Sequence, residues 1–323
     1  MQTGDDILIS IIIPVKNGDI WLDRLFRKLM EQTLIGRTEI IVIDSGSTDR
    51  SLEIIRQYPV RLIQIPSHEF NHGDTRNLGA REAKGKFVVM TVQDAVPASD
   101  VWLECFVEGF TDETVAGVCG QQIVPHEQDK NPMLWFRPMS EHTRRFYRFD
   151  DPAEFLRLSP EEQRQKAGWD NVTSAYRRDL LLQHPFERIE FAEDISWAKQ
   201  MLLKGYTLGH VDEAMTYHYH HHLPEFILPR YFAVYYFEYK IFGLRPRLSQ
   251  SLFKSALITI KILVKERKLS WPAKFKWFVF NMRYWLGVKA AINKFNAALD
   301  KGGEELDILY REICKKPPQA VKY

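Results

Sequence analysis

The chain has 323 residues, of which 45% are hydrophobic, so it can bury one sizeable core and form one or two domains. Its 44 basic and 42 acidic side chains give a net charge of +2, and this balance indicates no particular partner. The three cysteines are widely spaced and form no CxxC pair, which argues against a disulfide framework and against a zinc site.

The N-terminal sequence MQTGDDILIS is acidic before it turns apolar, unlike a secretory signal. No uncharged run reaches the roughly 18 residues that a membrane span needs. The longest candidate, residues 252–264, is interrupted by Lys254 and Lys261. We therefore expect a cytoplasmic protein.

The first 120 residues alternate between strand and helix patterns. Runs rich in Ile, Leu and Val predict strands at residues 7–15, 39–44, 60–65, 86–92 and 115–121. Apolar residues at helical spacing predict intervening helices at residues 20–32, from 50 onward, at 74–84 and at 100–110. This alternation predicts an α/β fold with a parallel sheet covered by helices.

The later part of the chain is less regular. Residues 122–168 are polar and weakly periodic, and we expect an excursion over the sheet edge. A strand and a helix are predicted within 171–183, a helix at 193–203 and a strand at 206–211. After His222 the pattern is helical to the end.

Polar segments follow four of the predicted strands, where open parallel sheets bind ligands. Asp44 ends a buried strand, and its carboxylate can accept hydrogen bonds from a base or a ribose. Ser47 and Asp49 can instead simply cap the next helix.

The segment from Phe70 to Asn77 combines Asn71, His72 and Arg76 at a helix start. Backbone N–H groups and an arginine fork both suit a phosphate, and the alternative is a capped helix with an exposed arginine. Asp94 follows another strand and can hold a divalent cation, or simply form a turn before Pro97.

Two further clusters lie later in the chain. Glu193 and Asp194 open a helix, where they interact with its dipole or serve as a general base. His218 and His220 share one face of a strand, which suits a metal or a phosphate. The adjacent His221 and His222 receive no role.

Taken together in this order, the motifs resemble a known family. Residues 12–17 and 44–49 resemble glycosyltransferase family 2, which has the GT-A fold. The rhamnosyltransferase branch of this family is similar to the chain at residues 70–80, 91–95, 120–122, 192–194 and 218–220. The resemblance extends over residues 7–240. It implies a Rossmann-like, mostly parallel sheet flanked by helices in a catalytic domain (1–225), followed by a helical, basic and aromatic extension (226–323).

The resemblance also implies site roles. The donor would be bound by Pro14, Val15, Lys16, Asp44, Ser45, His72, Arg76, Gln93 and Asp94. Asp94 and His218 would bind Mg2+ or Mn2+, and Asp194, or alternatively Glu193, would be the catalytic base. Further candidates are Asn71, Asn171 and His220.

The motif Gln93-Asp94-Ala95 departs from the family's usual pair of aspartates around one residue. Metal binding would therefore rest on one carboxylate and a histidine. The Gln-Asp form is common in the rhamnosyltransferase branch, so it favours dTDP-L-rhamnose as the donor. The implied enzyme is an inverting hexosyltransferase that builds bacterial surface polysaccharide on a saccharide or lipid-linked acceptor.

Twelve basic residues and only one acidic residue, Glu266, lie between Lys240 and Lys289, interleaved with aromatic residues. This segment predicts an amphipathic helix on the anionic inner face of the cell membrane, or else a hairpin that packs its aromatic side chains. Nucleic acid is not an expected partner, because no nucleic-acid module accompanies the tail.

Other functions stay open or are disfavoured. The same fold could use a UDP-sugar, and a catalytically silent sugar-nucleotide or glycan-binding protein is a second alternative. An oxidoreductase is disfavoured because no GxGxxG follows the first strand. A nucleotidyltransferase is disfavoured because no glycine-rich basic loop stands there.

Overall fold

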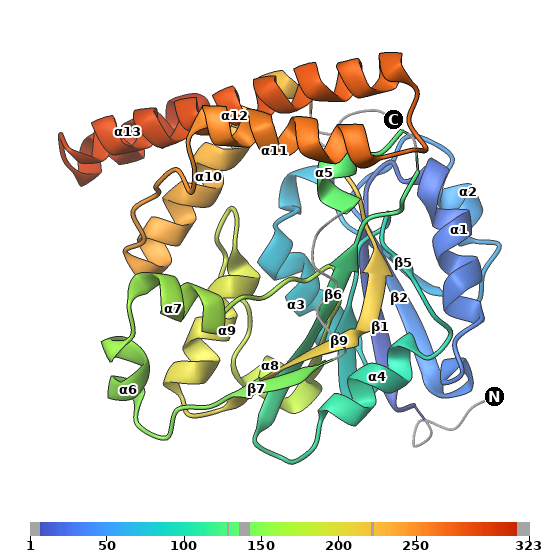
Figure 1. Ribbon diagram of the computed structural model, residues 1–323. Coiled ribbons are helices and arrows are strands. Elements are labelled where there is room, and N and C mark those ends of the chain that lie inside the picture. The colour runs from blue at the N-terminus through green and yellow to red at the C-terminus, as the bar shows by residue number, and fades with distance from the viewer. Residues whose placement is uncertain (1–6, 128, 136–142, 221–222, 315–323) are drawn as a thin grey trace. The chain divides into compact units, whose positions relative to one another are not determined.

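A computed structural model describes residues 7–127, 129–135, 143–220 and 223–314. Its contacts divide the chain into two compact units (Figure 1). The first unit comprises residues 1–123 and 139–218 and contains the sheet. The second comprises residues 124–138 and 219–323 and is helical in its described part.

Within the described residues, nine strands form one mixed sheet in the order β3-β2-β1-β4-β8-β6-β9-β5, and β7 also pairs with β9. The longest pairings, β1 with β2 and β6 with β9, are parallel, whereas β5, β7 and β8 run antiparallel to their neighbours. The strands are β1 (Ile9–Val15), β2 (Thr38–Asp44), β3 (Arg61–Gln64), β4 (Phe87–Met90), β5 (Val96–Pro97), β6 (Val115–Ile123), β7 (Arg144–Tyr147), β8 (Ser174–Arg177) and β9 (Thr207–Tyr217).

Helices cover both faces of the sheet because its central strands are apolar on both sides. Ile11 and Ile13 of β1 pack into the core with Leu25 and Phe26 of α1, while Ile12 approaches Gly79 of α3 so closely that no side chain fits there. The helices of this unit are α1 (Asp19–Met30), α2 (Ser51–Ile55), α3 (His72–Glu82), α4 (Trp102–Gly109), α6 (Pro152–Arg157), α7 (Pro160–Lys166), α8 (Arg178–Gln183) and α9 (Glu193–Leu203), with 3-10 turns η2 (Ile35–Arg37) and η3 (Ser67–Glu69).

The predicted strands and helices of the first 120 residues are all present, with ends shifted by a few residues. The region 122–168 holds more structure than its sequence pattern indicates. β7 lies there, and its exposed Arg144 and Arg145 carry no alternation, because pairing with β9 holds this short strand in place. Ser159 and Glu162 form a capping box at α7, a signal that was readable in the sequence.

The second unit consists of α5 (Pro132–Trp135), α10 (Pro224–Phe242), α11 (Leu252–Lys265), α12 (Trp271–Leu299) and α13 (Gly303–Ile313). Phe232 of α10 packs on Phe295 of α12, and Tyr236 stacks on Tyr310 of α13. Buried Asn131 and Asn281 exchange side-chain hydrogen bonds of 2.9 and 3.1 Å. Among the residues with defined positions, no helix is both long and apolar enough to span a membrane.

Candidate active site

The loop after β1 is tied to the loop after β4 by one side chain. The amide of Gln93 accepts a hydrogen bond from the backbone N–H of Lys16 (2.8 Å) and donates to the carbonyl oxygen of the same residue (3.1 Å). Lys16 in turn donates through Nζ to the carbonyl oxygen of Ser45 (3.0 Å) and to Oγ of Ser67 (2.5 Å). Gln93 and Lys16 thus fix the loop whose residues are expected to flank a base.

Asp44 ends β2 and is fully buried. Its carboxylate accepts hydrogen bonds from the backbone N–H groups of Gly46 (3.0 Å) and Ser47 (3.2 Å). Ser45 binds back to the carbonyl oxygen of Val15 through its N–H and its hydroxyl. Asp44 and Ser45 therefore shape the turn beside Pro14 and Val15, and a direct contact of Asp44 with a nucleoside stays a prediction.

Arg76 of α3 forms a buried ion pair with Glu193 at the start of α9. Nη1 of Arg76 lies 2.7 Å from Oε1 of Glu193, and both side chains are about 6% exposed. His72 lies one turn before Arg76, with Nδ1 3.4 Å from the same Nη1. Desolvation of the ring, reinforced by the charge of Arg76, lowers the pKa of His72, although the residue keeps contact with solvent.

Asn71 caps the helix that carries these residues. Its Oδ1 accepts hydrogen bonds from the N–H groups of Gly73 (3.0 Å) and Asp74 (3.1 Å), and its Nδ2 donates to the carbonyl oxygen of Ile189 (2.9 Å). Gly73 sits so close to the carbonyl oxygen of Glu187 that a Cβ would collide with it. Asn71 and Gly73 therefore fix the start of α3 against the segment that leads to Glu193 and Asp194.

Asp194 is the candidate for the catalytic base. Its carboxylate accepts hydrogen bonds from the backbone N–H groups of Asn171 (3.1 Å) and Ile195 (2.8 Å). Burial, together with the neighbouring carboxylates of Glu193 and Asp170, raises the pKa of Asp194 to about 7. A carboxylate of that pKa gives and takes protons near neutral pH.

Asn171 connects the two acids. Its Nδ2 donates to Oε1 of Glu193 (3.1 Å), and its Oδ1 accepts from the hydroxyl of Tyr176 (2.5 Å). Glu193 thus has both Arg76 and Asn171 as donors, and these two contacts fix its position. The raised pKa of Asp194 suits this acid to proton transfer near neutral pH.

Asp170 is a candidate site residue that the sequence patterns did not indicate. Its Oδ1 accepts a hydrogen bond from the N–H of Val172 (2.8 Å), and burial raises its pKa while the charges of His218 and Arg76 oppose this. Asp170 therefore lies within electrostatic reach of the expected metal ligand and of Asp194. Its position directly before the candidate Asn171 was the one signal that pointed to it.

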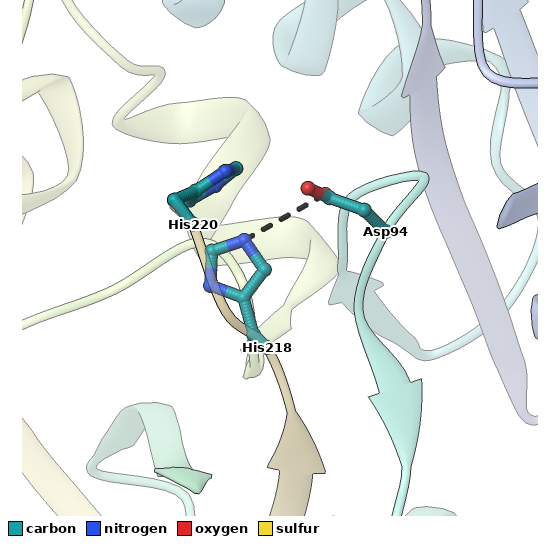
Figure 2. Close-up of side chains that lie close together, drawn as sticks. All are labelled: Asp94, His218 and His220. Carbon is teal, nitrogen blue, oxygen red and sulfur yellow. Dashed lines mark ion pairs between the residues drawn. The ribbon is translucent and has the colours of Figure 1, made fainter. Parts of the chain in front are cut away.

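The expected metal ligands Asp94 and His218 face each other, with Nε2 of His218 3.6 Å from Oδ1 of Asp94 (Figure 2). Nδ1 of His218 lies 2.7 Å from Oε1 of Gln122, a contact that leaves Nε2 turned toward Asp94. His220 follows His218 by two positions. One ligand atom from each of Asp94, His218 and His220 lies within 4.8 Å of the others. His221 and His222 lie outside the described residues.

One carboxylate and imidazole nitrogens form a donor set that suits Mn2+ and also fits Mg2+ through its oxygen. The residues present therefore fit a divalent cation. Gln93 does not join them, because its amide is engaged with Lys16. The Gln-Asp motif therefore offers a cation one side chain, whereas a pair of aspartates offers two.

Comparisons with known proteins identify the family of the chain. The sequence profile described as "Glycosyl transferase family 2" matches residues 10–168. The O-antigen chain rhamnosyltransferase RfbN of Salmonella typhimurium is 32% identical over 230 residues, which cover 69% of this chain and 70% of that protein. WbaN of Salmonella anatum, also an O-antigen chain rhamnosyltransferase, is 32% identical over 231 residues.

Solved structures share the fold at low identity. Mannosyltransferase PcManGT from Pyrobaculum calidifontis, in complex with GDP-Man and Mn2+, aligns with a TM-score of 0.50 and 18% identity over 96% of this chain and 81% of its own. S. aureus TarS 1-349 in complex with UDP-GlcNAc aligns with a TM-score of 0.52 and 16% identity over 96% and 91%. The chain belongs to glycosyl transferase family 2, has the GT-A fold and is a glycosyltransferase.

Proposed function

We propose that this glycosyltransferase transfers L-rhamnose from dTDP-L-rhamnose, with inversion, to a saccharide or lipid-linked saccharide during synthesis of a bacterial surface polysaccharide. The observation that carries this proposal is the 32% identity to an O-antigen chain rhamnosyltransferase over 69% of the chain. That alignment is long enough to include most of the sheet unit, where all the candidate site residues except His220 lie.

In the proposed mechanism Asp194 is the catalytic base. As the acceptor hydroxyl oxygen attacks the anomeric carbon, its proton passes to the carboxylate of Asp194. The bond between the anomeric carbon and the diphosphate oxygen breaks in the same step, and the electron pair leaves with the nucleoside diphosphate. A pKa of about 7 allows Asp194 to be ionised before the step and protonated after it.

Glu193 has a positioning role in this proposal instead of serving as the alternative base. Its ion pair with Arg76 and its hydrogen bond to Asn171 hold the starts of α3 and α9 together beside the proposed sugar site. Arg76 is 5% exposed and donates its hydrogen bond to Glu193. In this proposal it therefore stabilises the diphosphate through its positive charge and not through a direct hydrogen bond. His72, next to Arg76, is proposed to line the sugar or diphosphate as a hydrogen-bonding group.

Asp94 and His218 would hold Mg2+ or Mn2+, with His220 as a further candidate ligand. Such an ion, when bound, neutralises charge on the departing diphosphate. The presence of Mn2+ in the structure of PcManGT supports this assignment for the fold.

Gln93 is proposed to act on the donor through Lys16. Its paired hydrogen bonds to the backbone of Lys16 hold the loop from Pro14 to Lys16, which would flank the base with Asp44 and Ser45. Gln93 is thus a positioning residue for nucleotide binding.

We also propose that residues 1–225 form the catalytic domain and 226–323 a helical extension. The enzyme would work in the cytoplasm against the inner face of the cell membrane, where a lipid-linked acceptor is accessible. Nucleic acid is not a proposed partner.

A donor screen tests the proposal. The purified chain would be titrated by calorimetry with dTDP-L-rhamnose, UDP-glucose, UDP-galactose and GDP-mannose, with and without Mg2+ or Mn2+. Selective binding and slow hydrolysis of dTDP-L-rhamnose are expected. Preference for a UDP-sugar would refute the donor but keep the mechanism, and failure to bind any donor would favour a silent binding protein.

A further inference from the structure

Large apolar side chains are left in water at one place in the helical unit. Among the described residues, thirteen large hydrophobic side chains are exposed, and seven of them lie between residues 253 and 286. A cluster of this kind on a folded chain marks an interaction surface more often than scattered single residues do.

Helix α11 carries four of these side chains on a single face. Phe253, Leu257, Ile260 and Val264 are 74, 51, 46 and 58% exposed. Their spacing of three and four residues places them in one row, about 16 Å long at 1.5 Å per residue. We call this row the α11 apolar stripe.

The opposite face of α11 is turned inward although it includes two hydroxyl residues. Ser255 and Thr259 are buried, and each has a partner, because Ser255 accepts from Gln250 (3.0 Å) and Thr259 donates to the carbonyl oxygen of Ser255 (2.8 Å). Leu263 holds this face in a small core with Leu269 and Trp277. The packing of α11 therefore commits its apolar stripe to the outside.

Positive charge lies along the stripe. Lys254, Lys261 and Lys265 are exposed, and each follows a stripe residue by one position, so they form one row about 100° around the helix. The connection to α12 adds the exposed Arg267 and Lys268. Across α11 and this connection the one acidic side chain is that of Glu266.

The first turns of α12 repeat the combination. Trp271 and Phe275, one turn apart, are 75 and 70% exposed. The ammonium group of Lys274 lies 4.9 Å from the centre of the Trp271 ring, and Lys276 is exposed beside Phe275. Aromatic rings next to basic groups are the composition that settles at the boundary between lipid headgroups and acyl chains.

We propose that the α11 apolar stripe, together with Trp271 and Phe275, docks on an anionic lipid surface, with α11 lying in the plane of the headgroups. Lipid satisfies both parts of the surface, since acyl chains cover the apolar row and anionic headgroups neutralise the lysine row. The surface is argued from the helical unit alone, but its use in transfer to a membrane-held acceptor rests on the proposed function.

Two other occupants fit less well. A second copy of the chain, docked by a twofold axis through the stripe, would bring two lysine rows together without acidic partners. A nucleic acid would neutralise the lysines and stack on the aromatic rings, but it would leave Leu257, Ile260 and Val264 in water.

The test is sedimentation of the full chain with vesicles of phosphatidylcholine and phosphatidylglycerol in equal parts, compared with phosphatidylcholine alone. Binding to the mixed vesicles is expected. Replacing Lys254, Lys261 and Lys265 by Gln should weaken it roughly hundredfold, from about 1 kcal/mol per basic residue, and should not change binding to the neutral vesicles.

The apolar part is tested by the double variant Leu257→Gln and Ile260→Gln. Its matched control is Leu156→Gln with Ile20→Gln, which changes two side chains that are 57 and 65% exposed in the sheet unit. The first pair should lose most vesicle binding and the control pair should retain it. Because all four side chains are exposed, thermal unfolding followed by circular dichroism should match that of the unaltered chain.

Three results would overturn the proposal: no vesicle binding by the unaltered chain, equal binding by the stripe variant and its control, or a dimer in sedimentation velocity that the stripe variant converts to a monomer. Titration with dTDP-L-rhamnose without lipid separates the two proposals. Vesicle binding without binding of this donor contradicts the rhamnosyl donor assignment alone, and donor binding without vesicle binding contradicts the docking surface alone.

Discussion

Replacement of Asp194 by Asn should remove most turnover and at the same time change how stability depends on pH. Burial and two neighbouring carboxylates raise the pKa of Asp194 from an ordinary 3.8 to about 7 in the folded chain. At about 1.4 kcal/mol per pKa unit, holding Asp194 ionised costs the fold about 4 kcal/mol above pH 7.

The direction follows from proton binding. Below the unfolded pKa, both states carry the proton and Asp194 costs nothing. As the pH rises toward the folded pKa, the unfolded chain releases the proton and the folded chain keeps it, so stability falls with pH. Between about pH 5 and about pH 8 this loss amounts to about 3 kcal/mol. The Asn variant does not ionise, so it should lack this part of the pH dependence.

The assay is urea unfolding followed by tryptophan fluorescence, with the Asn variant and the unaltered chain compared at each pH. The amide nitrogen of Asn would face a backbone N–H where Asp194 accepts from Asn171 or Ile195, which costs about 1–3 kcal/mol at every pH. The difference between the two proteins should therefore shift in favour of the variant as the pH rises. Asp100→Asn, at an exposed position, is the control and should show a constant difference.

A difference that stays constant from about pH 5 to about pH 8 would refute the electrostatic account of Asp194. Turnover provides the second readout. Removal of a general base should lower the transfer rate by about 10²- to 10⁴-fold, and in the unaltered enzyme kcat/KM should rise with pH to a plateau above about pH 7. Turnover of the Asn variant at the normal rate would assign the base to another residue.

Three further predictions concern the rest of the site. Gln93→Glu should raise the donor KM about tenfold with little change in kcat, because a carboxylate repels the carbonyl oxygen of Lys16 and loosens its loop; an unchanged KM would contradict this role. Glu193→Gln should destabilise the chain by about 3–5 kcal/mol in urea unfolding, since it leaves buried Arg76 without its counter-ion, and a loss below about 1 kcal/mol would mean that the pair is not desolvated. Asp94→Ala should weaken Mn2+ binding in calorimetry at least about tenfold while leaving the fold intact, and unchanged affinity would place the ion elsewhere.

Much of the sheet unit was predictable because its signals are local. A run such as Ile9–Val15 is apolar at every position, so it predicts a strand buried on both faces without any knowledge of its neighbours. Parallel strands gather their carboxyl ends at one edge, which is why Lys16 and Gln93, 77 positions apart, could be expected to lie near each other. The strand β7 was not predicted, because its partner β9 and not its own pattern determines it.

The sequence by itself determined the fold class, the strand-end loops and the family resemblance, since each depends on short patterns of apolar, turn and polar residues. Tertiary structure alone decided the partners of buried charges. Arg76 pairs with Glu193 across 117 positions and His218 meets Gln122 across 96, and such choices depend on distances and burial that no local pattern contains. The same holds for α11: its periodicity predicts an apolar face, but only the packing of Leu263 against Trp277 turns that face outward.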